Sequence, residues 1–387
     1  MVKHAILSAS GSEKWLNCPP SARLEEQTAE ERSIYAEEGT FAHLLAEIHL
    51  KNYLNILNNA EYNKKLQKLK ENEFYSQEME DYLDTYIEIV VEKINEAKAR
   101  SKDTIVFLEQ KLDFSPWVPE GFGTGDVVII SDGIVEVVDF KYGKGVPVSA
   151  EGNTQMRLYG LGALNLFDVL YDINTIRMTI VQPRLDNVSS EKLAAEELLT
   201  WGNTFVKPRA EQAFKGEGKF TAGDHCRFCR AKATCRARAE ANLELARYDF
   251  QDPALLSNDE IAEILFKAEE LKAWAADIQA YALDQAFKHG VKFEGWKLVE
   301  GRSNRRYTDE EEVAKILIEK GYNEDDIYKK SILNITAMEK LLGKRKFNAI
   351  LNDLVVKPAG KPTLVPETDK RPELSSVAAA IEDFKNN

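Results

Sequence analysis

Residues 123–143 read GTGDVVIISDGIVEVVDFKYG and carry the strongest structural signal in the chain. Two runs rich in Val and Ile flank Ser131-Asp132-Gly133, which has the residue types of a tight turn. The stretch therefore predicts two strands joined by a hairpin turn. TIVFLEQKLDF, residues 104–114, has a similar composition and predicts another strand directly before them.

Helical patterns lie on both sides of these strands. Apolar residues recur at helical spacing in 36–54 and 79–97, whereas residues 58–74 are charged and look like an exposed connection. After the hairpin, the sequence predicts a helix in 153–167, NTQMRLYGLGALNLF, and then a strand in 175–184, TIRMTIVQPR. A further helix is predicted over about 189–214, which begins SSEKLAAEELL. We expect an α/β fold, a central mixed β-sheet flanked by helices.

The C-terminal third predicts a smaller, mainly helical unit. Residues 258–288 form one long amphipathic pattern, followed by a probable hairpin in 295–308 and two further helices. From residue 356 the chain is rich in Pro and charge, which is typical of an extended or disordered tail. The predicted domains are therefore 1–250, 251–355 and the tail 356–387.

The composition narrows the class of protein. The chain of 387 residues has 44% hydrophobic residues and a net charge of −13, which argues against indiscriminate nucleic-acid binding by its whole surface. It has no long apolar run, and its start, MVKHAILSASGSEKW, is too polar for the apolar region of a signal peptide. We expect a cytoplasmic protein that does not enter the membrane.

Two carboxylates and an ammonium are predicted to meet at one edge of the sheet. Alternation along the second hairpin strand places Asp139 and Lys141 on one face, with Phe140 on the other. The turn folds Asp126, on the first strand, back toward Asp139. Such a group can hold Mg2+ or Mn2+ and hydrolyse a phosphodiester, with the lysine serving the attacking water. The alternative is a surface salt bridge of little energetic value.

Four further residues are candidates for the same site. Gln155 and Tyr159 are four residues apart and share a helix face. His43 lies near the start of a predicted helix, where a packed core histidine is the alternative to a ligand. Glu109, on the first strand, is either a further site residue or an exposed strand carboxylate.

Three of the four cysteines are clustered in residues 225–236, HCRFCRAKATCR. In a reducing compartment this C-x2-C-x5-C spacing favours metal or redox chemistry over disulfides, and thiolate metal sites usually have four ligands. Residues 227–238 include several Arg and Lys residues and no Asp or Glu, so this segment is locally basic in a chain of net charge −13. It is either a solvated face or part of a path for DNA phosphates.

Taken in chain order, four short motifs resemble one family. They are Gly-x3-His at 39–43, Gly-x-Gly-Asp at 123–126, Asp-x-Lys at 139–141 and Gln-x3-Tyr at 155–159. The ordered set resembles the RecB-like branch of the PD-(D/E)XK nuclease superfamily over about residues 10–245, and is most similar to its phage and prophage nucleases. One departure is that Asp126 follows a glycine and not the proline of the superfamily name.

The resemblance implies a restriction-endonuclease-like core and assigns roles to residues. His43, Asp126 and Asp139 would bind the catalytic metal together with the backbone carbonyl of Phe140. Lys141 would serve the attacking water. Gln155 and Tyr159 would position the DNA or Lys141.

The cysteines add to the resemblance. Members of this branch with an iron-sulfur cluster, including CRISPR adaptation nucleases, use one cysteine before the core and three after it. Here these would be Cys18, Cys226, Cys229 and Cys235. The resemblance thus implies a [4Fe-4S] cluster that staples the N-terminal helices to the far side of the core. Four cysteines also suit structural Zn2+, so a zinc-stabilised module is the alternative.

The function predicted from all of these features is a metal-dependent DNA exonuclease. It would act on DNA ends in phage or prophage recombination, with DNA and a phage single-strand annealing or recombination protein as partners. The alternative is a non-catalytic DNA-binding or assembly factor in which the nuclease fold serves as a scaffold.

Overall fold

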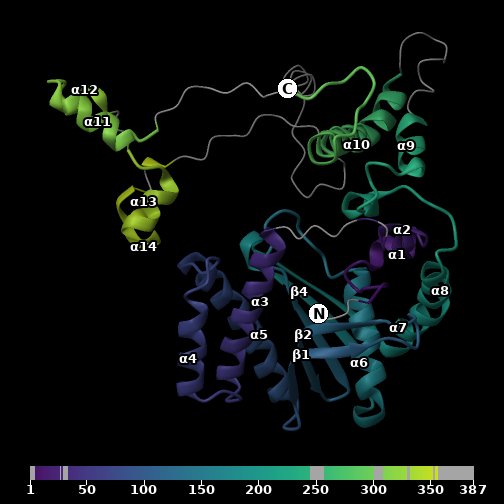
Figure 1. The fold of residues 1–387 in the computed structure, drawn as a ribbon. Helices are drawn as coiled ribbons and strands as arrows, with labels where there is room; N and C mark the ends of the chain where they lie inside the picture. The colour runs from purple at the N-terminus through teal and green to yellow at the C-terminus, as the bar shows by residue number, and fades with distance from the viewer. Residues whose placement is uncertain are drawn as a thin grey trace, which may run out of the picture. The chain divides into compact units, whose positions relative to one another are not determined.

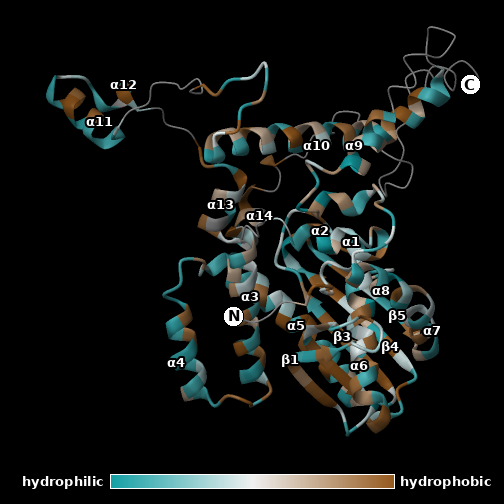
Figure 2. Ribbon diagram, turned by 45° about the vertical axis from the view of Figure 1, so that its right-hand side comes forward, coloured by the Kyte–Doolittle hydropathy of each residue, from teal (hydrophilic) through white to brown (hydrophobic). Residues whose placement is uncertain are grey.

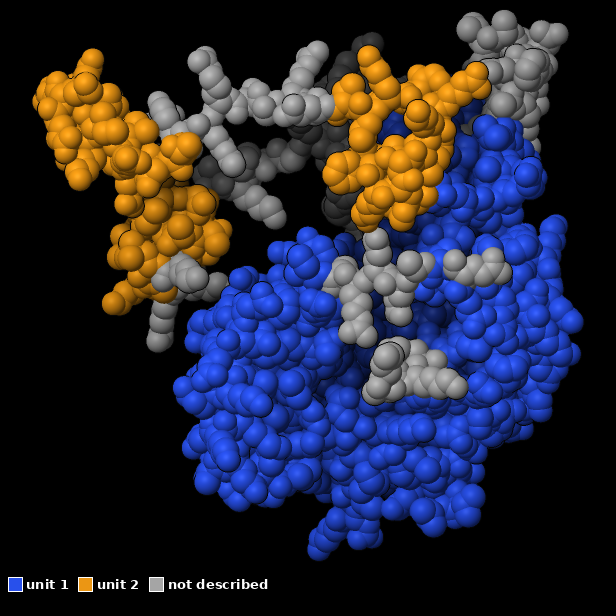
Figure 3. Space-filling model, viewed as in Figure 1, with its two compact units in different colours: residues 1–282 blue, residues 283–387 orange. Residues whose placement is uncertain are grey.

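The structure is a computed structural model of the chain that describes residues 5–26, 28, 34–244, 257–299, 308–328, 332–351 and 354–355. It divides into two compact units, residues 1–282 and 283–387, coloured blue and orange in Figure 3. Within the described ranges, no helix is both long and apolar enough to cross a membrane.

Unit 1 is built on a five-stranded mixed sheet with the order β1-β2-β3-β4-β5. The strands are β1 Ile105–Asp113, β2 Phe122–Ser131, β3 Ile134–Phe140, β4 Thr175–Gln182 and β5 Asn187–Ala194. All neighbours are antiparallel except β3 and β4, which are parallel and connected through helix α6, Thr154–Tyr171. The fold is therefore α/β, as the sequence predicts.

The hairpin between β2 and β3 has the predicted turn. Asp132 and Gly133 both have positive φ, 53° and 69°, which a two-residue turn of type I′ requires. A Cβ on Gly133 would lie 2.7 Å from the side chain of Asn174, so the close approach also selects glycine. The turn fixes the register, with Val127 opposite Val138.

Side chains alternate between the two faces of this sheet and create two cores. Val128 and Val137 belong to the core beneath α6, whereas Val127 and Val138 belong to the core beneath α3, Ile34–Tyr53, and α5, Gln77–Arg100. Figure 1 shows these helices on opposite sides of the strands, and Figure 2 shows hydrophobic residues concentrated in the sheet. Both faces are thus covered.

Short helices complete unit 1. They are α1 Ser12–Asn17, α2 Ser21–Glu26, α7 Ala195–Trp201, a π-helix Gly202–Val206, α8 Lys207–Lys215 and α9 Arg236–Leu243, with 3-10 turns at Pro183–Leu185 and Asp224–Phe228. Helices α1 and α2 pack against α8. This contact brings the N-terminal segment next to the chain that follows the sheet.

One segment predicted as a connection is a helix. Helix α4, Asn59–Leu69, starts with a capping box in which Asn58 and Glu61 satisfy each other's backbone N–H groups. It has no buried residues, so the predicted exposure is right and the predicted absence of regular structure is wrong. The local N-x-x-E signal at its start was sufficient to find it.

A second correction concerns the predicted helix 189–214, because its first residues form strand β5. Ala, Glu, Lys and Leu favour a helix there, but pairing with β4 overrides that preference. Glu191 points inward, where it accepts hydrogen bonds from Arg157 at 2.9 and 2.5 Å and from the Gly152 N–H at 3.0 Å. The helical part begins at Ala195.

The C-terminal region is helical, as predicted. Helix α10, Asn258–His289, is a single helix. In the described part of the chain after it, four shorter helices occur where the sequence predicts two: α11 Glu310–Glu319, α12 Glu324–Ile327, α13 Ile335–Leu342 and α14 Lys344–Leu351. The predicted hairpin falls largely outside the described residues, and residues 295–299 form no strand. The predicted tail, 356–387, also lies outside the described residues. The boundary between the two units falls within α10, whereas the sequence predicts a domain boundary at residue 250.

The Glu191 contacts give a prediction for stability. Burial would raise the pKa of Glu191, but the hydrogen bonds from Arg157 and Gly152 outweigh it and lower the pKa below its usual range. This contribution is present above the usual glutamate pKa and is lost as pH falls through the lowered value. Glu191→Gln should cost about 1–2 kcal/mol at pH 7 in urea unfolding, and progressively less below about pH 4.

The exposed Glu196→Gln is the matched control for this measurement. It should change the free energy of unfolding by less than about 0.5 kcal/mol at pH 7. Equal destabilisation by both substitutions would contradict the role assigned to Glu191.

Candidate active site

The hairpin brings Asp126 and Asp139 to neighbouring positions on β2 and β3. The backbone N–H of Phe140, the residue after Asp139, donates a 2.6 Å hydrogen bond to Asp126 Oδ2. Asp126 is therefore fixed to the peptide group that links Asp139 to Phe140. The turn thus returns Asp126 to the end of the strand that carries Asp139.

The strands are irregular where Asp126 lies. A Cβ on Gly125 would face Leu112 and Val128 in the α6 core, yet Asp126 and Val127 both lie toward α3 and α5. Across from Asp126, Glu109 has a positive φ of 50°, in a conformation that few glutamates adopt. This break in alternation lets the Glu109 and Asp126 side chains share one pocket with His43.

His43 approaches this pocket from α3. Its Nδ1 lies 3.2 Å from Asp126 Oδ1, and its ring lies 5.1 Å from that of Phe140. Burial lowers the pKa of His43, but the negative charge and hydrogen bond of Asp126 outweigh it, so the pKa is raised overall. Ligand atoms of His43, Glu109 and Asp126 all lie within 4.8 Å of one another, which is compatible with a shared metal ion.

The Glu109 carboxyl group responds to the same surroundings. Partial burial and then the charge of Asp126 raise its pKa to about 7, although much of the residue is in contact with solvent, which screens the effect. A bound cation would favour the carboxylate form. Glu109 thus lies within reach of His43 and Asp126, while its exposure also fits the alternative of a strand carboxylate in solvent.

Asp139 faces α6 and is almost entirely buried. Its Oδ2 lies 3.0 Å from Lys141 Nζ, and its Oδ1 lies 3.4 Å from Gln155 Nε2. Burial raises the pKa of Asp139, partly offset by the charge of Lys141. The Lys141 ammonium group is thus the described cation that faces Oδ2, and a metal ion at this oxygen would share it with the lysine.

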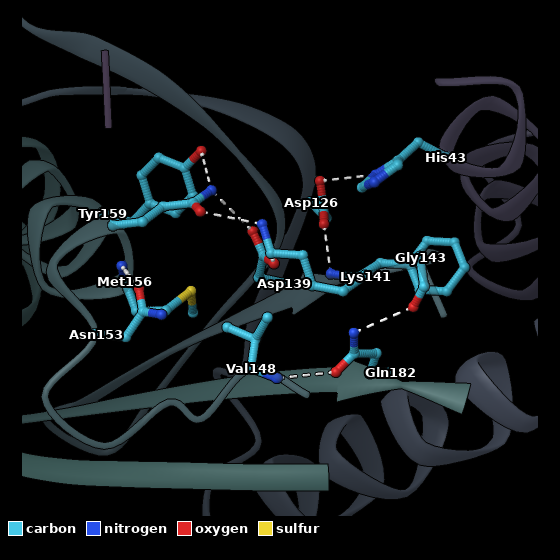
Figure 4. A network of polar contacts seen from close by, with 12 residues as sticks. His43, Asp126, Asp139, Lys141, Gly143, Val148, Asn153, Met156, Tyr159 and Gln182 are labelled. Carbon is cyan, nitrogen blue, oxygen red and sulfur yellow. Dashed lines mark hydrogen bonds and ion pairs between the residues drawn. The ribbon is translucent and has the colours of Figure 1, made fainter. Parts of the chain in front are cut away.

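Gln155 connects the remaining predicted residues. It accepts a 3.0 Å hydrogen bond from Lys141 Nζ and donates one of 3.0 Å to the Tyr159 hydroxyl. Burial, followed by the charge of Asp139, raises the pKa of Tyr159 and keeps the phenol neutral. Figure 4 shows Tyr159 and His43 approaching the two aspartates from opposite sides.

The loop after Lys141 is held by a residue that the sequence analysis did not select. Gln182, at the end of β4, donates to the Gly143 carbonyl at 3.1 Å and accepts from the Val148 N–H at 3.1 Å (Figure 4). It also donates to the Val146 carbonyl at 2.9 Å. A polar residue directly after an apolar strand, as in IVQPR, was the available signal. Gln182 fixes the path of the chain between β3 and α6.

All four cysteines line a second pocket of about 340 Å3, part of it open solvent. Cys18 lies between α1 and α2, and its Sγ accepts a 3.5 Å hydrogen bond from the Thr221 N–H. Glu25 joins the two segments because it accepts from Lys14 Nζ at 2.8 Å and from the Arg230 N–H at 2.7 Å. The N-terminal segment and the cysteine segment are therefore side by side.

The sulfur atoms of this pocket are more widely spread than a single tetrahedral zinc ion requires. Zinc–sulfur bonds of about 2.3 Å place thiolates roughly 3.8 Å apart. Among the described residues, no three cysteine sulfurs lie within 4.8 Å of one another. Burial raises the pKa of Cys229 to about 11 in the metal-free chain, so a bound metal would be needed to hold its thiolate.

A family model matches residues 4–372 of the chain, with the description "Protein of unknown function (DUF2800)". The chain belongs to the DUF2800 family. A solved structure titled "Crystal structure of SSO0001" is 14% identical in sequence, with alignment over 58% of this chain and 96% of that one and a TM-score of 0.21. At that TM-score the likeness supports no statement about function.

In this DUF2800 protein, the residues predicted from the four motifs meet around one sheet edge. The grouping differs from the predicted ligand set in one respect, because His43 and Asp126 are closest to Glu109, whereas Asp139 is turned toward Lys141 and Gln155. The Phe140 side chain is buried and stacks on Tyr86, with ring centroids 4.4 Å apart. Its carbonyl group as a ligand stays a prediction.

The grouping of His43, Glu109 and Asp126 gives a prediction that titration of the DUF2800 protein with Mn2+ can test. Asp126→Asn should weaken binding at least about tenfold in calorimetric titration, because it removes a negative ligand from the three-residue group. Glu47→Gln is the matched control, since Glu47 lines the same pocket but pairs with Lys51. It should change the affinity less than threefold, and equal losses in both variants would argue against a metal at Asp126.

Proposed function

We propose that this protein is a divalent-metal-dependent deoxyribonuclease that hydrolyses phosphodiester bonds from DNA ends. The observation that carries the proposal is the meeting of Asp126, Asp139 and Lys141 at one sheet edge. His43 reaches that edge from α3, and Gln155 reaches it from α6 on the opposite face. This is the group of side chains that metal-assisted phosphodiester hydrolysis requires.

Burial argues against a purely structural salt bridge. The Asp139 side chain is 5% exposed and Lys141 is 29% exposed. Taking such charges out of water costs more than an apolar pair of the same size would, so a buried ion pair is poor evidence of stabilisation. A functional requirement for these charges is the better explanation.

The donor atoms suit Mg2+ or Mn2+. Asp126, Asp139 and His43 would hold the ion, with Glu109 within reach of two of them. When bound, the ion would polarise the phosphate and lower the pKa of an attacking water. The grouping of the His43, Glu109 and Asp126 ligand atoms within 4.8 Å of one another supports this fit.

Lys141 is placed to serve the water and the phosphate. Its ammonium group is held between Asp139 and Gln155, each at 3.0 Å, so its direction is fixed before substrate arrives. Tyr159 restrains Gln155 in turn. Lys141 would orient the nucleophile and offset charge that develops on the phosphate oxygens.

The finer parts of the proposal rest on the resemblance to RecB-like nucleases. These are DNA as the substrate, attack from its ends, a cytoplasmic place in phage or prophage recombination, and a single-strand annealing protein as partner. The alternative is a DNA-binding or assembly factor without catalysis. The buried charges around Asp139 favour the nuclease, since a scaffold would not require them.

Digestion of end-labelled linear DNA tests the proposal. With Mg2+ or Mn2+ the protein should degrade the DNA, and Asp139→Asn or Lys141→Ala should each reduce the rate at least about a hundredfold. Lys144→Ala is the matched control, because Lys144 is exposed on the adjacent loop. It should retain the rate within about threefold.

Two results of this assay would count against the proposal. Binding of DNA without degradation across metals and strand forms would favour the non-catalytic alternative. Full activity of Asp139→Asn would show that the nuclease, if present, uses another site.

We further propose that Cys18, Cys226, Cys229 and Cys235 hold a [4Fe-4S] cluster. Their common pocket supports a shared metal centre, and the resemblance to the iron-sulfur members of the RecB-like branch favours a cluster over one zinc ion. The cluster would staple the α1–α2 segment to the chain after α8, and closing so long a loop restricts the unfolded chain. Glu25 holds the same two segments together without a metal.

Anaerobic purification should give a coloured protein with about four iron atoms per chain, as the proposed cluster contains. Cys18→Ser should lose colour and iron and lower the thermal unfolding temperature, because the staple is opened. Ser21→Ala is the control, since Ser21 lines the same pocket without a thiol. A colourless wild-type protein with one zinc per chain would overturn the cluster and support the zinc module.

A further inference from the structure

Arg184 lies beside the candidate active site but has no place in the four motifs. It belongs to the 3-10 turn Pro183–Leu185 that directly follows β4. Because β3 and β4 are parallel, their C-terminal ends lie at the same sheet edge, and the Lys141 N–H donates to the Val181 carbonyl at 2.9 Å. Arg184 therefore emerges at the edge that carries Asp139 and Lys141.

The guanidinium group is held between aromatic rings. Its central carbon lies 4.6 Å from the ring centroid of Tyr142 and 6.0 Å from that of Tyr82. The side chain is only 10% exposed. Burial raises the pKa of Tyr142 to about 12, so this ring stays neutral beside the cation. The ring contacts and the low exposure restrict the movement of the guanidinium group and its access to water.

Only one nitrogen of Arg184 is used by the described residues. Nη1 lies 3.3 and 3.5 Å from the two carboxylate oxygens of Glu38, so the contact is long and is not the two-nitrogen fork that arginine forms with an anion of matching shape. Glu38 is 27% exposed and can turn toward solvent. The Arg184 guanidinium group is thus already oriented, and Glu38 binds it only through long contacts.

Glu38 and Arg184 belong to elements that also carry or adjoin the candidate site. Glu38 precedes His43 by five residues on α3, which corresponds to roughly 7.5 Å along the helix axis. On the other side, Tyr142 directly follows Lys141 in the chain. A strand of nucleic acid with one phosphate at the metal site would therefore have another phosphate available to Arg184.

We propose that Arg184, framed by Tyr142 and Tyr82, is a second phosphate-binding site that takes a DNA phosphate other than the one being cleaved. Glu38 occupies this site in the free protein and is displaced when the phosphate binds. The inference rests on the proposed nuclease function and adds a position that holds the substrate. The phosphate is either internal to the strand or at its end, since both present the same oxygens to the guanidinium group.

A purely structural ion pair predicts a different outcome. If Glu38 and Arg184 only stabilised the fold, neutralising either one would weaken DNA binding or leave it unchanged. If Glu38 competes with phosphate, its neutralisation should strengthen binding while neutralisation of Arg184 weakens it. The opposite signs separate the two explanations.

The experiment measures DNA binding by fluorescence anisotropy with the full chain in an Asp139→Asn background, where cleavage is blocked. Labelled single strands would carry a 5′-phosphate, a 3′-phosphate or no terminal phosphate. Arg184→Gln should weaken binding about tenfold, as expected for loss of a charged hydrogen-bond donor, and Arg184→Lys should weaken it less. Glu38→Gln should tighten binding about threefold and have no effect once Arg184 is replaced.

The matched control is Arg209→Gln. Arg209 also lies over an aromatic ring, that of Phe205 at 3.9 Å, but on α8 away from the sheet edge. Its replacement should leave binding unchanged. Should Arg184→Gln fail to fold, as judged by circular dichroism, the tightening by Glu38→Gln still decides the matter.

The strand forms identify the source of the phosphate. Equal weakening of all three by Arg184→Gln supports an internal phosphate, and weakening confined to one phosphorylated end supports a terminal phosphate at that end. Unchanged affinity in every form, or weaker binding by Glu38→Gln, overturns the phosphate site.

Failure of the nuclease proposal gives a different pattern from failure of this site. Cleavage by the wild-type chain without an effect of Arg184 or Glu38 overturns the phosphate site alone. Opposite effects of the two residues on binding, in a chain that never cleaves, overturn the nuclease alone. A chain that binds no DNA overturns both.

Discussion

The hydrogen bond from the Phe140 N–H to the Asp126 carboxylate joins the two halves of the candidate active site. It is possible because the β2–β3 turn sets the register and because the strands depart from regular alternation at Asp126 and Glu109. Without that departure, Asp126 would point into the apolar core under α6. The irregularity places the Asp126 carboxylate beside His43 and next to the peptide group that follows Asp139.

Both helical layers contribute to the site, and each does so from a well-packed face. His43 projects from α3, which is anchored on the sheet by buried residues such as Leu45, and Gln155 projects from α6, which is anchored by Met156 and Leu158. Their polar groups meet at an edge where the apolar cores end. The cost of burying Asp139 is met by Lys141 and Gln155, which restrain one another.

The cysteine pocket lies apart from the candidate active site and connects different parts of the chain. It joins residues before the sheet to residues after it, and Glu25 reinforces the same junction. The segment continues into α9, where Arg238 is buried and pairs with Glu270 and Asp277 of α10 at 2.7 and 2.6 Å. A cluster in the pocket would thereby stabilise a region that extends from α1 to α10.

The sequence by itself determined the features that depend on neighbouring residues. The hairpin turn, the alternation that separates Asp139 from Phe140, and the spacing of Gln155 and Tyr159 are local, and all were predictable. The capping box of α4 is local as well and was overlooked. Only the tertiary structure decided the rest: β5 is a strand because β4 offers an edge, Glu109 and Asp126 turn toward His43, and Arg184 meets Glu38 across 146 residues. These choices depend on contacts between distant segments, whose energies no local pattern contains.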